Sequence, residues 1–358
     1  MKLLFILENF DLGGVERVTF QLLTSLKASY PKIEFSVVYE NAEGEFFKQY
    51  NDSFECIGLS GSNFLARSRS FKTILNRLSS NVVIYCKGGL SKYKINIAKD
   101  KNIKHVAIQH VPIDLPETRW WKNSIRKLGA AILYRRMDKV VCVSKGIENN
   151  LIRKLFLHKS KLITIYNPVI DENIIEQAQE NIEYNDFYVC VGRLHYQKGY
   201  DYLIKAVSLL VNKIPSFKVI IIGDGEDKAL LEKKIINLNL SDNIILHGST
   251  SNPYKYIKRA KAILLTSRWE GLPTVLVEAA YLDTQIVSFD CRYGPRELTN
   301  NGENGYLVNN GDIIKFADYI NAIDEGQVKP SANVDEFTLE KSTFNYLTLF
   351  ESLICKKL

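Results

Sequence analysis

The sequence predicts an α/β protein of two doubly wound, Rossmann-like domains, each built on a parallel sheet. The chain has 358 residues, which is too long for one ordinary core and suits about two domains. With 46% hydrophobic and 24% charged residues, its composition is that of a folded protein and not of a disordered one. Short β-branched runs alternate with amphipathic helical stretches throughout, which is typical of parallel α/β sheets.

The first half should form one domain, residues 1–170. Strands are predicted at 3–7, 35–39, 82–85, 105–109, 139–143 and 162–165, because these short runs are apolar and rich in β-branched residues. Amphipathic periodicity predicts helices at 15–28, 120–137 and 145–156. Ser144 precedes the last of these and should cap it.

The second half should form another domain, residues 171–336. Strands are predicted at 188–191, 218–222, 244–247, 262–266, 285–289 and 305–308, with helices between them at 201–212, 228–238 and 273–282. The polar stretch 171–186, just after Asn167-Pro168, is the candidate hinge. A helix over 337–355, within the terminal segment 337–358, is expected to pack on either domain.

The sequence also indicates the cellular compartment. Glu8 and Asp11 interrupt the apolar start, and no apolar run approaches the roughly 20 residues that span a bilayer. The six cysteines lack the spacing of a metal knuckle or a redox dithiol, so we expect reduced thiols in a cytoplasmic protein.

The two halves differ in charge. Residues 1–170 carry 27 Lys and Arg against 14 Asp and Glu, whereas the remainder carries 20 against 26. Within the basic half, residues 119–136 combine Trp120 and Trp121 with aliphatic residues and six cations. One interpretation is a peripheral contact with the inner face of the cytoplasmic membrane. The other is a domain helix with a solvated basic face and a buried apolar one: Ile125, Leu128, Ile132 and Leu133. No nucleic-acid recognition signature occurs, so no nucleic-acid partner is expected.

The turn after strand 188–191 is a candidate phosphate site. Arg193 and Lys198 lie between Gly192 and Gly199, just before a helix. A guanidinium, an ammonium and helix amides around one turn suit a diphosphate. The alternative is a pair of solvated loop cations.

A second anion site is predicted where a helix begins after strand 262–266. Pro273 suits a first helical turn. The segment Gly271, Leu272, Pro273, Thr274 and Val275 is therefore expected to present free backbone N–H groups. Glu270 and Glu278 would be repelled by phosphate and are better explained as acceptors for sugar hydroxyls. Glu270 has an alternative role as a carboxylate that stabilises the helix dipole.

These motifs together resemble the GT4-like class of retaining glycosyltransferases. The resemblance rests on order and spacing over about 120 residues. It joins Gly-Arg-Leu-x3-Lys-Gly at 192–199, Gly-Asp-Gly at 223–225, Glu-x7-Glu at 270–278 and Gly-Pro-x-Glu-x7-Gly-Tyr-Leu-Val at 294–308. It implies the GT-B fold, in which two Rossmann-like domains face each other across a cleft.

The resemblance also implies roles for individual residues. Arg193 and Lys198 would neutralise the donor diphosphate, Glu278 would bind the ribose, and Glu270 the donor sugar. Gly223 and Gly225 would let the backbone approach the nucleotide, and His247 would lie near the base. The implied donor is a nucleotide-diphosphate sugar, with UDP as the default, and the implied pathway is bacterial surface polysaccharide or lipopolysaccharide synthesis on a glycan or lipid-linked acceptor.

The first domain should supply the acceptor side. Gly13 and Gly14 open a helix after the first strand, and in the resembling family this loop reaches the donor phosphates. Glu16, His110 and Asp114 are the acceptor candidates, with a flexible turn and a structural loop histidine as the alternatives. Glu270, His110, Arg193 and Lys198 are therefore the residues expected to take part in transfer.

No metal is expected, since no Asp-x-Asp pair occurs to bind one. No cofactor is expected either. The cations and helix ends would stabilise the departing diphosphate. Two rival functions remain: a nucleotide-sugar epimerase, which would convert the donor without an acceptor, and a non-catalytic nucleotide-sugar-binding subunit of a polysaccharide assembly.

Overall fold

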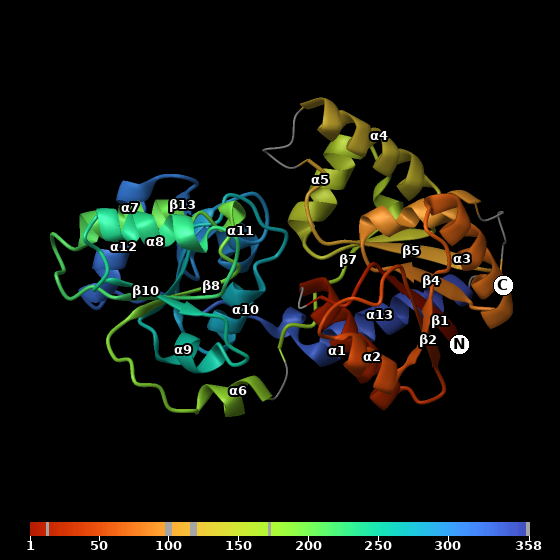
Figure 1. Cartoon of the computed structure of the whole chain (residues 1–358), viewed down its shortest axis with the longest axis horizontal. Coiled ribbons are helices and arrows are strands. Elements are labelled where there is room, and N and C mark those ends of the chain that lie inside the picture. The colour runs from red at the N-terminus through yellow and green to blue at the C-terminus, as the bar shows by residue number, and fades with distance from the viewer. Residues whose placement is uncertain (12–13, 97–101, 115–119, 171–172, 356–358) are drawn as a thin grey trace. The chain divides into compact units, whose positions relative to one another are not determined.

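The structure is a computed structural model that describes residues 1–11, 14–96, 102–114, 120–170 and 173–355. The chain divides into two compact units. Unit 1 comprises Met1–Pro168 together with Glu336–Leu358, and unit 2 comprises Val169–Asp335 (Figure 1). Unit 1 is therefore discontinuous in sequence, and its closing segment follows unit 2 along the chain.

Unit 1 is built on a seven-stranded parallel sheet of order β3-β2-β1-β4-β5-β6-β7. The strands are β1 (Lys2–Leu7), β2 (Glu34–Tyr39), β3 (Glu55–Gly58), β4 (Val82–Tyr85), β5 (Lys104–Gln109), β6 (Lys139–Cys142) and β7 (Leu162–Thr164). The helices are α1 (Gly14–Ser29), α2 (Phe47–Ser53), α3 (Phe64–Leu78), α4 (Trp120–Arg135), α5 (Lys145–Leu155) and α13 (Leu339–Ile354), with short 3-10 turns at Gly88–Asn96 and Lys159–Lys161. Helices α1 and α13 cover one face of the sheet, and α3 and α4 the other (Figure 1).

The predicted elements of unit 1 form for the expected reasons. The run Leu3–Leu7 is fully buried, as a central strand covered on both faces requires. Ser144 accepts a hydrogen bond from the backbone N–H of Ile147, which confirms the predicted helix cap. Helix α13 packs on α1, where Thr343 bonds Ser25 at 2.9 Å. The C-terminal helix thus belongs to unit 1.

Unit 2 is built on a six-stranded parallel sheet of order β10-β9-β8-β11-β12-β13. The strands are β8 (Tyr188–Val191), β9 (Val219–Ile222), β10 (Ile244–Gly248), β11 (Ala262–Leu265), β12 (Gln285–Asp290) and β13 (Tyr306–Asn309). The helices are α6 (Asn173–Ala178), α7 (Tyr200–Leu210), α8 (Lys228–Asn237), α9 (Tyr254–Arg259), α10 (Thr274–Tyr281), α11 (Pro295–Leu298) and α12 (Ile313–Asp324), with 3-10 turns at Tyr196–Lys198, Asn300–Gly302 and, just after the unit, Asp335–Phe337.

The strand order of unit 2 reverses at its centre. From β8 the chain winds outward through β9 to β10, whereas β11, β12 and β13 extend the sheet in the opposite direction. In open α/β sheets, ligands bind outside the carboxyl ends of the strands at such a reversal. The loops that leave β8 and β11 are therefore the first place to look for a ligand site.

Three expectations need correction. Part of the expected hinge at 171–186 is helix α6, because Ile174 and Ala178 are buried in unit 2. Strand β3 was not predicted, since its four residues include only one long aliphatic side chain. Of the two interpretations of residues 119–136, the one with a buried apolar face is wrong for three of its four residues, because Ile125, Leu128 and Ile132 are exposed.

Candidate functional site

The loops after β8 and β11 are joined by several hydrogen bonds. The backbone N–H of Arg268 donates to the Gln197 carbonyl at 2.7 Å, and the Gln197 side chain donates to the Trp269 carbonyl at 2.9 Å. The Arg268 guanidinium stacks over the Tyr196 ring at 3.7 Å from the ring centroid and pairs with Asp201 at 2.8 Å. These contacts hold the two loops as one structure at the strand reversal.

Lys198 and Glu270 meet between these loops. The Lys198 Nζ lies 2.8 Å from Glu270 Oε1, and the Ser267 hydroxyl donates to the same oxygen at 2.6 Å. Glu270 is buried, and a buried carboxylate requires such partners because of its desolvation cost. Sequence reasoning named both residues with separate roles, but the structure couples them in one ion pair.

Gly199 permits the close approach of the two loops. Its φ is +65°, and a Cβ at this position would lie 2.1 Å from the backbone oxygen of Thr266. The left-handed backbone disfavours a side chain, and the contact with Thr266 leaves no room for one.

Replacing Gly199 with alanine is expected to destabilise unit 2 by at least about 2 kcal/mol, from left-handed strain plus steric overlap. Urea unfolding of the full chain measures this. Gly326→Ala is the matched control, because Gly326 has a φ of +88° with open space around its Cβ position. An equal loss in both variants would show that the contact with Thr266 contributes nothing.

Arg193 and the two predicted glycines, Gly223 and Gly225, belong to the loops that follow β8 and β9. Arg193 is exposed, and its guanidinium is 3.6 Å from Glu226. A Cβ on Gly223 would lie 2.1 Å from the Gly192 carbonyl oxygen, and one on Gly225 would lie 2.3 Å from that of Leu194. These glycines therefore let their own loop approach the backbone of the loop that carries Arg193.

Helix α10 begins next to Glu270. Pro273 is the N-cap of α10, one position before the expected first turn, and Gly294 packs against its ring. Gly271, Leu272 and Pro273 are buried, while Thr274 and Val275 at the helix start are half-exposed. Glu278 is buried inside α10, and His247 at the end of β10 bonds the Tyr256 hydroxyl at 2.8 Å.

Unit 1 has a cavity of ≈ 480 Å³ at the carboxyl edge of its sheet. Its walls are mainly apolar, and its lining includes His110, Lys87 and Arg126. His110 follows β5 as predicted; burial, offset in part by a backbone hydrogen bond with Cys86, lowers its pKa to about 4. Its buried Nε2 has no hydrogen-bond partner among the described residues. A neutral imidazole with one such nitrogen is suited to a ligand hydroxyl.

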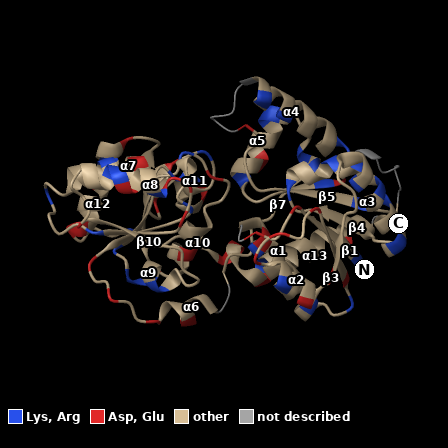
Figure 2. Ribbon diagram, in the orientation of Figure 1, with Lys and Arg blue, Asp and Glu red and all other residues tan. Residues whose placement is uncertain are grey.

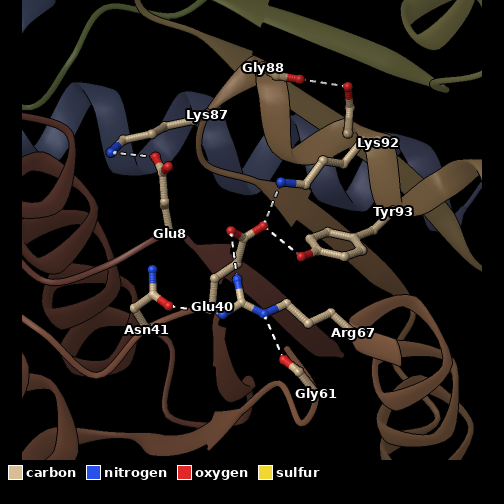
Figure 3. Close-up of polar contacts among 10 residues, drawn as sticks. Glu8, Glu40, Asn41, Gly61, Arg67, Lys87, Gly88, Lys92 and Tyr93 are labelled. Carbon is tan, nitrogen blue, oxygen red and sulfur yellow. Dashed lines mark hydrogen bonds and ion pairs between the residues drawn. The ribbon is translucent and has the colours of Figure 1, made fainter. Parts of the chain in front are cut away.

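Glu16 proves to be a partner of Lys87. Its carboxylate is buried, 2.8 Å from the Lys87 Nζ, and Glu8 lies 3.3 Å from the same nitrogen (Figure 3 shows the Glu8 contact). This arrangement holds the lysine at the cavity. Gly14 starts α1 with open space around its Cβ position, whereas Gly13 lies outside the described residues.

A second cluster at this edge was missed by sequence reasoning. The buried Glu40 side chain lies 2.8 Å from Lys92 Nζ, accepts the Tyr93 hydroxyl at 2.6 Å and pairs with Arg67 at 3.4 Å (Figure 3). Asp114 is also engaged within unit 1, by Asn150 at 3.0 Å and by Lys154 at 3.5 Å. Its role as an acceptor residue stays a prediction.

The buried histidines should make stability depend on pH. Burial lowers the pKa of His105 to about 3 and that of His110 to about 4. Below pH 6.5 the unfolded chain binds protons that the folded chain does not, so stability falls from about pH 6.5 towards 4. We expect a loss of about 1 kcal/mol per histidine between pH 7.5 and 5.5, measured by urea unfolding. His105→Gln should reduce this loss by the contribution of one histidine. An unchanged pH dependence of the unfolding free energy would contradict the lowered pKa of His105.

Two features are absent from the part of the chain that the structure describes. Among the described residues, no group of three or more His, Cys, Asp or Glu side chains is placed to hold a metal ion. No described helix has both the length and the apolar character to cross a membrane. The six cysteines are free, and Cys86, Cys142, Cys190 and Cys291 are buried.

Comparison with known proteins agrees with this geometry. The profile of Glycosyl transferases group 1 matches residues 171–338, and that of Glycosyltransferase Family 4 matches residues 12–173. The chain is 28% identical over 355 residues to the lipopolysaccharide 1,6-galactosyltransferase of Salmonella typhimurium, covering 95% of this chain and 94% of that one.

Two further matches bear on the ligands. Over 198 residues the chain is 32% identical to N-acetylgalactosamine-N,N'-diacetylbacillosaminyl-diphospho-undecaprenol 4-alpha-N-acetylgalactosaminyltransferase of Campylobacter jejuni, covering 54% of this chain and 53% of that one. The crystal structure of Anabaena HepE in complex with UDP matches with a TM-score of 0.80 at 19% identity, over 98% of this chain and 100% of that one. With two family profiles that together span residues 12–338 and a fold of two parallel-sheet units, the chain belongs to the GT4-type glycosyltransferases and has the GT-B fold.

Proposed function

We propose that this glycosyltransferase moves a hexose or N-acetylhexosamine from a UDP-sugar to a glycan or lipid-linked acceptor in bacterial surface polysaccharide or lipopolysaccharide synthesis. We further propose that it retains the anomeric configuration, needs no metal and works at the inner face of the cytoplasmic membrane. The observation that carries the proposal is the Lys198–Glu270 pair at the strand reversal of unit 2. UDP as the nucleotide is supported by the complex of the Anabaena neighbour.

Lys198 can serve both Glu270 and a donor phosphate. An ammonium has three N–H donors, and Glu270 takes one of them in the structure. The others remain for diphosphate oxygens, beside the exposed guanidinium of Arg193 and the N–H groups at the start of α10. Glu270 keeps acceptor capacity for a sugar hydroxyl, since a carboxylate has about four lone-pair sites.

Transfer then follows from charge stabilisation. The acceptor oxygen forms a bond to the anomeric carbon while the bond from that carbon to the diphosphate breaks. The acceptor hydroxyl proton passes to the departing phosphate oxygen on the same face of the sugar. Lys198 and Arg193 stabilise the negative charge that grows on the diphosphate, and this is the main contribution of the protein.

The acceptor is assigned to unit 1. His110 and Lys87 belong to the lining of the same cavity, and the buried Nε2 of His110 lacks a hydrogen-bond partner among the described residues. A lipid-linked acceptor is supported by the name of the Campylobacter relative, which specifies a diphospho-undecaprenol carrier.

A donor panel tests the proposal. Purified protein is incubated with UDP-, GDP- and ADP-sugars and scored by release of the nucleoside diphosphate, first alone and then with lipid-linked acceptors. We expect release to require a UDP-sugar and to rise with an acceptor, and NMR should show a product of the donor's anomeric configuration. An inverted product, conversion of the donor without any acceptor, or no turnover at all would contradict the proposal.

A further inference from the structure

Helix α4 carries an unusual outer face. Trp121, Ile125, Leu128 and Ile132 are 42%, 64%, 66% and 46% exposed. Their spacing of four, three and four residues aligns them along one side of a helix, in a stripe about 16 Å long. The opposite side is the buried one, with Ala130 and Tyr134 in the core. We call these four residues the α4 stripe.

Positive charge flanks the α4 stripe. Lys122, Arg135 and the following Arg136 are exposed, and α4 contains no Asp or Glu. Figure 2 shows Lys and Arg along this helix. Residues 1–170, which make up most of unit 1, carry 27 Lys and Arg against 14 Asp and Glu. An apolar strip between cations suits a surface that is apolar inside and anionic outside.

The solvent-facing position of these side chains has no explanation among the described residues of unit 1. Four large apolar side chains aligned on one exposed face exceed the scattered hydrophobic residues that any protein surface shows. Ile125 and Leu128 are mostly exposed, whereas Ala130 and Tyr134 of α4 are buried. The face is therefore available to a partner.

We infer that the α4 stripe docks this chain on an anionic phospholipid bilayer, with the apolar side chains at the level of the acyl chains and Lys122, Arg135 and Arg136 among the headgroup phosphates. The inference rests on the proposed function in two respects, the location at the membrane and the lipid-linked acceptor. It adds the surface that holds the enzyme where such an acceptor lies.

Vesicle sedimentation of the full chain tests the docking. We expect it to sediment with vesicles of phosphatidylcholine and phosphatidylglycerol and to remain in solution with phosphatidylcholine alone. The double variant Ile125→Ser with Leu128→Ser should bind the mixed vesicles about tenfold more weakly or worse, because it removes two of the four apolar contacts. Lys122→Gln should cost about fivefold, and the loss should shrink in high salt.

The matched control lies on α8 in unit 2. Ile236 and Leu230 are 64% and 53% exposed, and the double variant Ile236→Ser with Leu230→Ser should bind as the natural chain does. The inference is wrong if the α4 variant binds the mixed vesicles as well as the natural chain does, or if the α8 control loses as much binding as the α4 variant. It is also wrong if the chain does not bind vesicles and the α4 variant instead converts a dimer to a monomer.

Activity separates this inference from the proposed function. The α4 double variant should still release UDP from the donor with a water-soluble acceptor, which also shows that it folds. If the natural chain releases no nucleotide while vesicle binding follows the expected pattern, the proposed function fails and the docking surface stands.

Discussion

Replacing Lys198 with methionine is expected to lower kcat/KM for the nucleotide-sugar donor by about 10²- to 10³-fold, the usual loss when one charge-stabilising donor is removed. Methionine keeps the apolar stem and removes only the ammonium. In the natural chain this ammonium lies 2.8 Å from Glu270 and is only partly exposed, so water replaces it poorly. The measurement is steady-state nucleotide release with the best donor and acceptor.

Lys261→Met is the matched control. Lys261 immediately precedes β11 and lies 2.6 Å from both Asp186 and Asp324. Lys261 is half-buried and ion-paired. It lies at the amino end of β11, whereas Glu270 follows the carboxyl end of β11. Its loss should affect stability but leave turnover within about threefold of the natural chain, because charges at the opposite sheet edge are screened.

A double variant separates two roles of Lys198. If the lysine acted only by neutralising buried Glu270, then Lys198→Met combined with Glu270→Gln would restore turnover. We expect no recovery, because the phosphate would still lack its partner and the sugar would lose its acceptor. Recovery to near the natural rate would show that the pair is merely structural.

Phe350→Ala should destabilise unit 1 by about 3–5 kcal/mol, the range for a buried phenylalanine that leaves a cavity. Phe350 on α13 is completely buried, and its ring meets that of Phe5 on β1 edge-on, with the centroids 6.4 Å apart. The central strand of the sheet would lose a large contact. Urea unfolding monitored by tryptophan fluorescence and circular dichroism measures the change.

Phe344 provides the control on the same helix. It is 56% exposed, so Phe344→Ala should change the unfolding free energy by less than about 0.5 kcal/mol. If the two phenylalanine variants lose equal stability, α13 does not contribute through the contact with β1.

Much of the fold could be predicted because each strand has a local signature. Runs such as Val219–Ile222 are buried on both sides and therefore apolar throughout. The loops of unit 2 could also be predicted, since Gly199 and Pro273 mark the places where a helix starts after a strand. Their meeting at the strand reversal follows from the strand order and not from any one motif.

Contacts between distant segments could not be predicted. Glu40 is held by Arg67 of α3 and by Lys92 and Tyr93 of the 3-10 turn Gly88–Asn96, and nothing in the spacing of these segments indicates that they meet. The Lys198–Glu270 pair joins residues 72 positions apart. Each residue was identified by its motif, but their coupling depends on the adjacency of β8 and β11.

Helix α4 shows a different limit. Its apolar residues recur at helical spacing, and this periodicity identifies a face without saying what covers it. The small Ala130 and the polar-tipped Tyr134 pack on the sheet, whereas Ile125 and Leu128 face outward. The assumption that the most aliphatic side lies inward therefore gave the wrong core.

The discontinuity of unit 1 affects how the chain is made on the ribosome. Its sheet strands end at Thr164, but α13, which covers β1, begins only at Leu339. At 5–20 residues per second, roughly 10 to 35 s pass between the synthesis of these two segments. During this interval unit 2 can fold as it emerges, while Phe5 lacks its contact with Phe350. The nascent N-terminal half is thus expected to expose part of its core until translation reaches the segment that completes it.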